Sequence, residues 1–163
     1  SSSYREFVVP EDAPTTTAAV AAGTHALPEC PQLKLVRMEG EVYFGATQHV
    51  ADTLHALRHL PQPREHLLVM GKSMNFIDVA GAELWEAELS ARRAIGGDLY
   101  FHRPRPEVIS MWTTTGFTRL LGPEHQFPDK RTAIATIFHK LDPEICRHCT
   151  ARVFWECKTV PGP

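Results

Sequence analysis

The stretch from residue 66 to 96 constrains the fold most, because its hydrophobic pattern changes halfway along. Leu67 to Met70 is a short apolar run without charge, which is typical of a strand buried on both faces. Residues 71 to 77 then turn the chain. Beyond Gly81 the apolar residues recur at helical spacing until Gly96 ends the pattern. A strand, a loop and a helix in succession are the repeating unit of an α/β domain.

The predicted helix has one apolar and one polar face. The face predicted to be buried carries Leu84, Ala87, Ala91, Ala94 and Ile95. Glu83, Glu86 and Glu88 are predicted to lie in solvent rather than to act as paired catalytic acids. Glu88 and Arg92 are four residues apart, in the order that favours an ion pair. The helix is therefore expected to pack through aliphatic side chains and to contribute no catalytic group.

The residues before this unit predict a hairpin and a helix. Residues 33–38 and 42–44, joined by a turn at 39–41, have the pattern of a β-hairpin. Helical spacing then begins at Ala46, and Pro61 stops it.

The residues after the unit continue the alternation of strands and helices. Residues 99–101 predict a third buried strand, and a short extended segment is expected around Phe127. Pro106 begins a short helix, and Asp129 is a plausible N-cap for a helix that runs to Leu141. We therefore predict an α/β fold: a mixed β-sheet of four to five strands with an N-terminal hairpin, flanked by four to five helices.

The composition excludes several classes of protein. Of the 163 residues, 43% are hydrophobic and 22% are charged, as in an ordinary soluble globular domain. The net charge of −2 gives no support for nucleic-acid binding. No apolar run approaches the roughly 20 residues that span a bilayer, and no signal peptide is recognisable. Nucleophile-elbow, phosphate-loop and zinc-protease motifs are all missing, so the sequence predicts no enzyme.

The loop between the central strand and its helix is a candidate ligand- or partner-binding site. Loops at the carboxyl ends of strands, beside helix N-termini, present free N–H groups and the positive end of a helix dipole. The alternative is purely structural: Asp78 caps the helix, and Gly81 permits close packing. The candidate residues are Ser73, Met74, Asn75, Asp78, Ala80 and Gly81.

Three of the four cysteines gather near the C-terminus, and the fourth, Cys30, stands alone. Cys146 and Cys149 have the C-x2-C spacing of metal ligands, and Cys157 with His148 or His139 completes a candidate zinc set. Because no second C-x2-C pair is present, the alternative that all these thiols are reduced and bind no metal stays open.

Residues 76–81, Phe-Ile-Asp-Val-Ala-Gly, resemble the signature of the STAS domain. That domain is shared by anti-sigma-factor antagonists and by the cytoplasmic tail of SulP-type sulfate and anion transporters. Its pattern is a buried strand, a loop ending in two apolar residues, Asp, any residue, a small residue and Gly, and then a helix. The resemblance extends in order and spacing over residues 33–141, and the predicted hairpin resembles the opening hairpin of transporter-type members.

The resemblance implies three parts of the chain. Residues 1–32 would be a linker from a transmembrane part that this chain lacks, residues 33–141 a STAS domain, and residues 142–163 a cysteine-containing tail. In stand-alone antagonists the residue before the motif's Gly is a serine that a partner kinase phosphorylates. Here that residue is Ala80, which has no hydroxyl, so the departure favours the transporter type.

The resemblance therefore implies a regulatory domain of a secondary active transporter for sulfate, bicarbonate or a dicarboxylate. It would lie at the cytoplasmic face of the inner (plasma) membrane. Its implied partners are the transmembrane transport domain of the same polypeptide, a second copy in a homodimer, and acyl carrier protein or a guanine nucleotide, with no required cofactor. Two alternatives stay open: a stand-alone antagonist-like binding module, and a small metal- or redox-sensing protein that acts through its tail cysteines.

Overall fold

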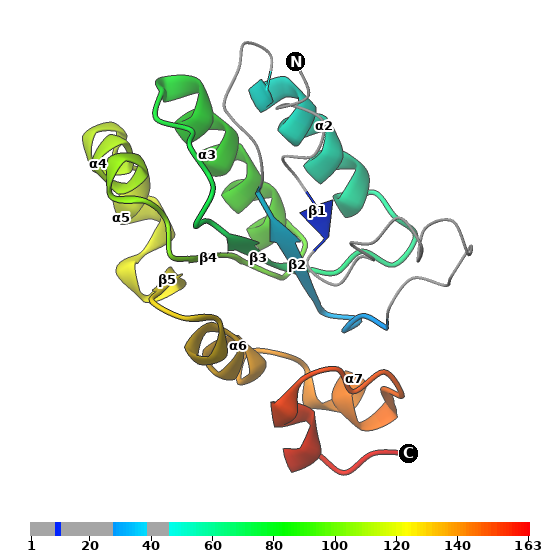
Figure 1. Cartoon of the computed structure of the whole chain (residues 1–163). Coiled ribbons are helices and arrows are strands. Elements are labelled where there is room, and N and C mark those ends of the chain that lie inside the picture. The colour runs from blue at the N-terminus through cyan, green and yellow to red at the C-terminus, as the bar shows by residue number, and fades with distance from the viewer. Residues whose placement is uncertain (1–8, 11–27, 39–45) are drawn as a thin grey trace, which may run out of the picture.

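The computed structural model describes residues 9–10, 28–38 and 46–163, and its centre is one five-stranded sheet (Figure 1). The strands lie in the order β1 (Val9–Pro10), β2 (Leu33–Arg37), β3 (His66–Met70), β4 (Leu99–His102) and β5 (Gln126–Phe127). β1 pairs antiparallel with β2, and the pairs from β2 to β5 are parallel. The predicted mixed α/β fold is confirmed.

Helices cover both faces of this sheet. Their bounds are α2 (Ala46–Arg58), α3 (Val79–Ala94), α4 (Pro106–Thr115), α5 (Phe117–Leu121), α6 (Lys130–Phe138) and α7 (Pro143–His148), with 3-10 turns η2 (Pro123–His125) and η3 (Trp155–Thr159). In Figure 1, α2, α3, α4 and α5 lie on one side of the sheet, and α6, α7 and the C-terminal residues lie on the other.

The two faces of the sheet build two separate cores, because side chains of a strand alternate between them. Leu67 and Val69 of β3 pack with residues of α2, α3, α4 and α5 in the first core. Within it, the rings of Trp85 and Phe101 meet edge to face with centroids 5.1 Å apart. Leu68 and Met70 point the other way, into a second core that contains α6 residues and Cys30.

The sequence prediction is confirmed for most elements and incomplete for others. The strands at 33–37, 66–70 and 99–102 and the extended segment at Phe127 are present. The short helices α5 and α7 were not predicted. The second strand of the predicted hairpin, residues 42–44, lies outside the described residues.

The predicted buried face of α3 is only partly correct. Leu84 packs against the first core and Ala91 is half-buried, but the fully buried side chains belong mostly to the neighbouring positions. The side chains that are buried come from Ala82, Trp85, Glu88, Leu89 and Arg92, whereas Ala87, Ala94 and Ile95 are exposed. The prediction placed Glu88 in solvent, but Glu88 is only 3% exposed, and its predicted partner Arg92 is only 1% exposed. The cause is their mutual neutralisation, which lets two charged side chains occupy a buried face.

Glu88 stands between two arginines from different elements. Its Oε2 accepts a hydrogen bond from Arg92 Nε at 2.6 Å, and its Oε1 accepts one from Arg58 Nη1 of α2, also at 2.6 Å. Arg92 also donates to the backbone carbonyl of Arg64, just before β3. Burial lowers the pKa of the Arg92 guanidinium, and the hydrogen bond with Glu88 opposes that change. This cluster joins α2, α3 and the entry to β3.

We predict that Glu88→Gln destabilises the fold by about 3 kcal/mol, because it leaves buried guanidinium charge without a counterion. Urea unfolding monitored by tryptophan fluorescence would measure the loss. Glu86→Gln is the matched control: Glu86 lies on the exposed side of the same helix, so its replacement should change stability by less than about 0.5 kcal/mol. Equal effects of the two replacements would contradict this account.

A second buried polar group, on the opposite face of the sheet, is a histidine. His66 Nδ1 lies 3.0 Å from the hydroxyl oxygen of Tyr100, and the Tyr100 ring stacks on His125 with centroids 4.7 Å apart. Burial lowers the pKa of His66 from its ordinary 6.5, positive charge on Lys140 and Arg92 adds to that shift, and Asp98 opposes it. The folded protein therefore favours the neutral imidazole.

This histidine makes stability depend on pH. Because the folded-state pKa is depressed, the contribution of the neutral ring is complete above the unfolded pKa of 6.5 and is lost as the pH falls below it. We predict that the free energy of unfolding, measured in urea at pH 7.5 and 5.5, falls more for the native chain than for His66→Asn. His139→Asn, at an exposed histidine, should keep the native pH dependence. If the free energy of unfolding depends on pH identically in the native chain and in His66→Asn, His66 is not the cause of that dependence.

Candidate functional site

The loop that follows β3 is held against the end of β4. Gly71 N donates to His102 O at 2.7 Å, and Met74 N donates back to Gly71 O at 3.1 Å, which closes a turn. A Cβ on residue 71 would lie only 3.1 Å from the His102 oxygen, so glycine permits this close approach. The loops after β3 and β4 therefore meet at the carboxyl edge of the sheet.

Asp78 caps α3 in the way that its position in the sequence predicts. Its backbone is extended (φ −112°, ψ 171°), and its side-chain Oδ1 accepts a hydrogen bond from Gly81 N at 2.9 Å. A Cβ on Gly81 would lie 2.5 Å from Phe76 Cβ, so a side chain there would displace Phe76 from the core. Asp78 and Gly81 thus set the direction in which the loop enters the helix.

The six predicted site residues divide between surface and core. Ser73, Asp78 and Ala80 are exposed, and Asn75 is half-buried. Met74 is 1% exposed and packs in the first core, and Gly81 is also buried. Met74 and Gly81 therefore shape the loop from beneath, and the other four residues contribute to its outer surface.

Two exposed aliphatic residues belong to the same surface. Ile77 is 51% exposed and Val79 is 54% exposed, on either side of the capping Asp78. The sequence analysis placed both within the motif but did not name them as site residues. The signal was available: two β-branched apolar residues flank a solvent-facing helix cap. We define the α3 N-terminal surface as Ser73, Asn75, Ile77, Asp78, Val79 and Ala80.

The loop after β4 places basic side chains at the same edge of the sheet. Arg103 adopts a left-handed backbone conformation (φ 49°) that non-glycine residues rarely occupy, and its N–H donates to Phe127 O at 2.9 Å. Arg103 and Arg105 are both exposed, and Arg105 lies 3.4 Å from the Glu107 carboxylate. This edge therefore combines apolar, acidic and basic side chains.

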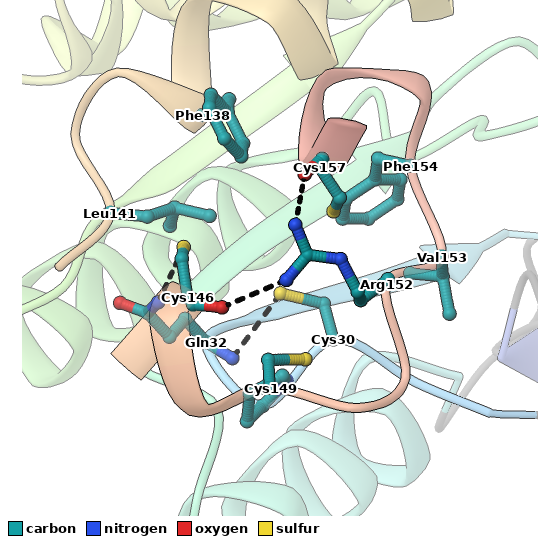
Figure 2. A pocket seen from close by; sticks show the side chains of 11 residues that line it. Cys30, Gln32, Phe138, Leu141, Cys146, Cys149, Arg152, Val153, Phe154 and Cys157 are labelled. Carbon is teal, nitrogen blue, oxygen red and sulfur yellow. Dashed lines mark hydrogen bonds between the residues drawn. The ribbon is translucent and has the colours of Figure 1, made fainter. Parts of the chain in front are cut away.

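Apart from His139, the predicted metal ligands lie at the other end of the sheet, in residues 142–163, which we call the C-terminal segment. Cys146, Cys149 and Cys157 line one cavity of about 20 Å³, together with Cys30 (Figure 2). His148 does not line this cavity; it is exposed, and its Nδ1 lies 3.0 Å from Glu144 O. Within the described residues, no three His, Cys, Asp or Glu side chains are arranged to hold a metal ion as they stand.

Two polar side chains fix the C-terminal segment beside the start of β2. The buried Gln32 amide donates from Nε2 to Asp142 O at 3.1 Å and accepts from Asp142 N at 2.7 Å, which anchors the start of α7. Arg152 donates to the carbonyls of Cys146, Cys157 and Val160. Burial raises the pKa of the Cys30 thiol and of the Cys146 thiol. Both are therefore poorer nucleophiles than an ordinary thiol.

In the part of the chain that the structure describes, no helix combines the length and apolar character needed to cross a bilayer.

Comparison with known proteins identifies the family. A family model for the STAS domain matches residues 25–133, and no curated protein matches the chain. The structure of the murine Slc26a9 anion transporter in its inward-facing state is 14% identical, with a TM-score of 0.61. That match covers 81% of this chain but only 22% of the transporter, so the chain spans about a fifth of that protein.

Two smaller proteins share the fold. The STAS domain of a SulP transporter from Vibrio cholerae is 17% identical, with a TM-score of 0.56 over 74% of this chain and 91% of its own. The unphosphorylated anti-sigma factor antagonist SpoIIAA is 17% identical, with a TM-score of 0.55 over 69% of this chain and 94% of its own. The family model covers more than half of the chain and agrees with the observed strand, loop, cap and helix, so the chain belongs to the STAS domain family.

Proposed function

We propose that this chain is the regulatory and interaction domain of a SulP-type secondary active anion transporter, at the cytoplasmic face of the membrane. In this role the domain performs no chemistry. It binds the transmembrane part of its own polypeptide and supports transport of sulfate, bicarbonate or a dicarboxylate. Similarity to a transporter of which the chain spans only about a fifth supports a role as one part of a larger protein.

Ala80 is the observation that carries this proposal. The fold does not separate the two functional classes, because a SulP transporter domain and an antagonist both share it. Ala80 is exposed in the first turn of α3, at the position where the family resemblance places the phosphorylated serine of antagonists. Without a hydroxyl it accepts no phosphate, so a partner-switching cycle has no site there.

The α3 N-terminal surface is the part of the domain that we assign to partner binding. Ile77 and Val79 supply exposed apolar area, and the N-terminus of α3 adds the positive end of a helix dipole. An apolar centre with a polar rim suits a protein partner. A homodimer, acyl carrier protein and a guanine nucleotide remain predictions from the family resemblance, as further partners of the same domain.

We predict that the protein behaves as part of an integral membrane protein in its own cells. An antibody raised against this chain should detect a band far above 18.3 kDa that leaves the membrane fraction only with detergent. A soluble band near 18.3 kDa would reject the transporter proposal and favour a free-standing, antagonist-like module.

A second prediction concerns the α3 N-terminal surface. The double change Ile77→Asp with Val79→Asp in the full-length transporter should lower anion uptake at least about tenfold, because it places two charges in an apolar contact. Uptake of radiolabelled anion, normalised to transporter in the membrane, would measure the effect.

The control for this change is Leu120→Asp, which also replaces an exposed aliphatic side chain, 48% exposed, on α5. It should leave uptake unchanged. Thermal melting of the isolated 163-residue chain should be similar for all variants, because the altered side chains are exposed. Equal loss of uptake in the Leu120 variant and the double variant would remove the assignment of this surface.

A further inference from the structure

All four cysteines of the chain surround one cavity, although they are far apart in the sequence. Cys30 precedes β2, Cys146 lies in α7, Cys149 caps that helix, and Cys157 lies in η3. Figure 2 shows the four side chains around the same space, contributed by three separate segments. All four are free thiols, so no disulfide accounts for their proximity.

Thiols are the main candidate ligands in this cavity. Among the residues that the structure describes, the other lining side chains are apolar except for Gln32 and Arg152, and neither a carboxylate nor an imidazole lines it. A set of four sulfur ligands is the one that Zn²⁺ and similar soft ions prefer, in tetrahedral geometry. A volume of about 20 Å³ accommodates one occupant the size of a water molecule or ion.

We propose that Cys30, Cys146, Cys149 and Cys157 bind a single Zn²⁺ ion that ties the C-terminal segment to the start of β2. Each thiol gives up its proton to solvent and coordinates through sulfur, so binding releases four protons. Four thiolates and Zn²⁺ carry a net charge of −2. The guanidinium of Arg152, which lines the same cavity, offsets part of this charge.

The backbone around the cavity is already fixed. Arg152 holds a left-handed conformation (φ 46°), and its guanidinium donates to the carbonyls of both Cys146 and Cys157. A non-glycine residue persists in this region only where its surroundings determine it. The side chain of Arg152 therefore sets the relative position of the two segments that carry three of the four thiols.

Gln32 donates hydrogen bonds to two of the four sulfur atoms. Gln32 N donates to Cys30 Sγ at 3.4 Å, and Gln32 Nε2 donates to Cys146 Sγ at 3.5 Å. Such outer contacts orient ligands and stabilise thiolate charge in metal sites. The sulfurs themselves do not yet converge within the described residues, so binding requires rotation about the single Cα–Cβ bond of the cysteines.

The decisive measurement is metal content of the 163-residue chain. The chain would be produced without a polyhistidine tag, incubated with Zn²⁺ under reducing conditions, desalted and analysed by mass spectrometry for metals. We expect about one zinc ion per chain, and less than about a tenth of that in Cys30→Ser and Cys157→Ser. His148→Ala is the matched control and should retain zinc, because His148 lies outside the cavity.

These outcomes separate the proposed site from the set that the sequence suggests. Zinc well below one ion per chain in the native protein would overturn the proposal. Unchanged zinc in Cys30→Ser would also overturn it, because the ligands would then be the tail residues alone.

A second measurement remains decisive if a serine variant fails to fold. Co²⁺ bound to the native chain should give the intense visible absorption of tetrahedral cobalt together with a sulfur-to-cobalt charge-transfer band. Zn²⁺ should displace it, and Cys149 and Cys157, which are half-buried in the metal-free chain, should become protected from a maleimide. A spectrum of octahedral cobalt, or unchanged maleimide reactivity of Cys149 and Cys157, would reject the site while leaving the transporter proposal unaffected.

Discussion

The burial of β3 on both faces is the constraint on which the rest of the structure depends. Its five residues are all buried, and its side chains alternate between two cores. The strand is stable only if a layer covers each face. α2, α3, α4 and α5 form the first layer, whereas α6 alone is too short to form the second. Leu141, Cys146 and Phe154 complete it, so the C-terminal segment belongs to the packing of the sheet.

The direction of the parallel strands separates the two candidate sites. The α3 N-terminal surface and the Arg103 loop follow the carboxyl ends of β3 and β4, where parallel strands bring their loops together. Cys30 and Gln32 instead precede the amino end of β2, and the C-terminal segment meets them there. The same sheet therefore carries the α3 N-terminal surface, with its exposed aliphatic side chains, at one end and a thiol-lined cavity at the other.

Hydrophobic periodicity and helix-capping residues predicted the individual strands and helices well. Contacts between segments that are distant in the sequence were predicted poorly. The unit from residue 66 to 96, the Asp78 cap and the role of Gly81 follow from periodicity and capping chemistry within a few residues. The burial of Glu88 was not predicted because it depends on Arg58 of another helix, which neutralises Glu88 together with Arg92. Nothing in the sequence around Cys30 predicted that it would lie beside the other cysteines. Only the fold of the whole chain brings it close to Cys146, Cys149 and Cys157.

The separation of the two sites limits what metal binding can do. A ligand changes a distant surface only if it binds two states of the protein with different affinity. The strands between the cysteine cavity and the α3 N-terminal surface pack in both cores and are paired in register, and such close packing disfavours a second arrangement of them. An ion at the four thiols would act instead on the second core, by holding the C-terminal segment over β2. Its effect would fall on the stability of the domain, whereas the surface proposed for partner binding lies at the opposite end of the sheet.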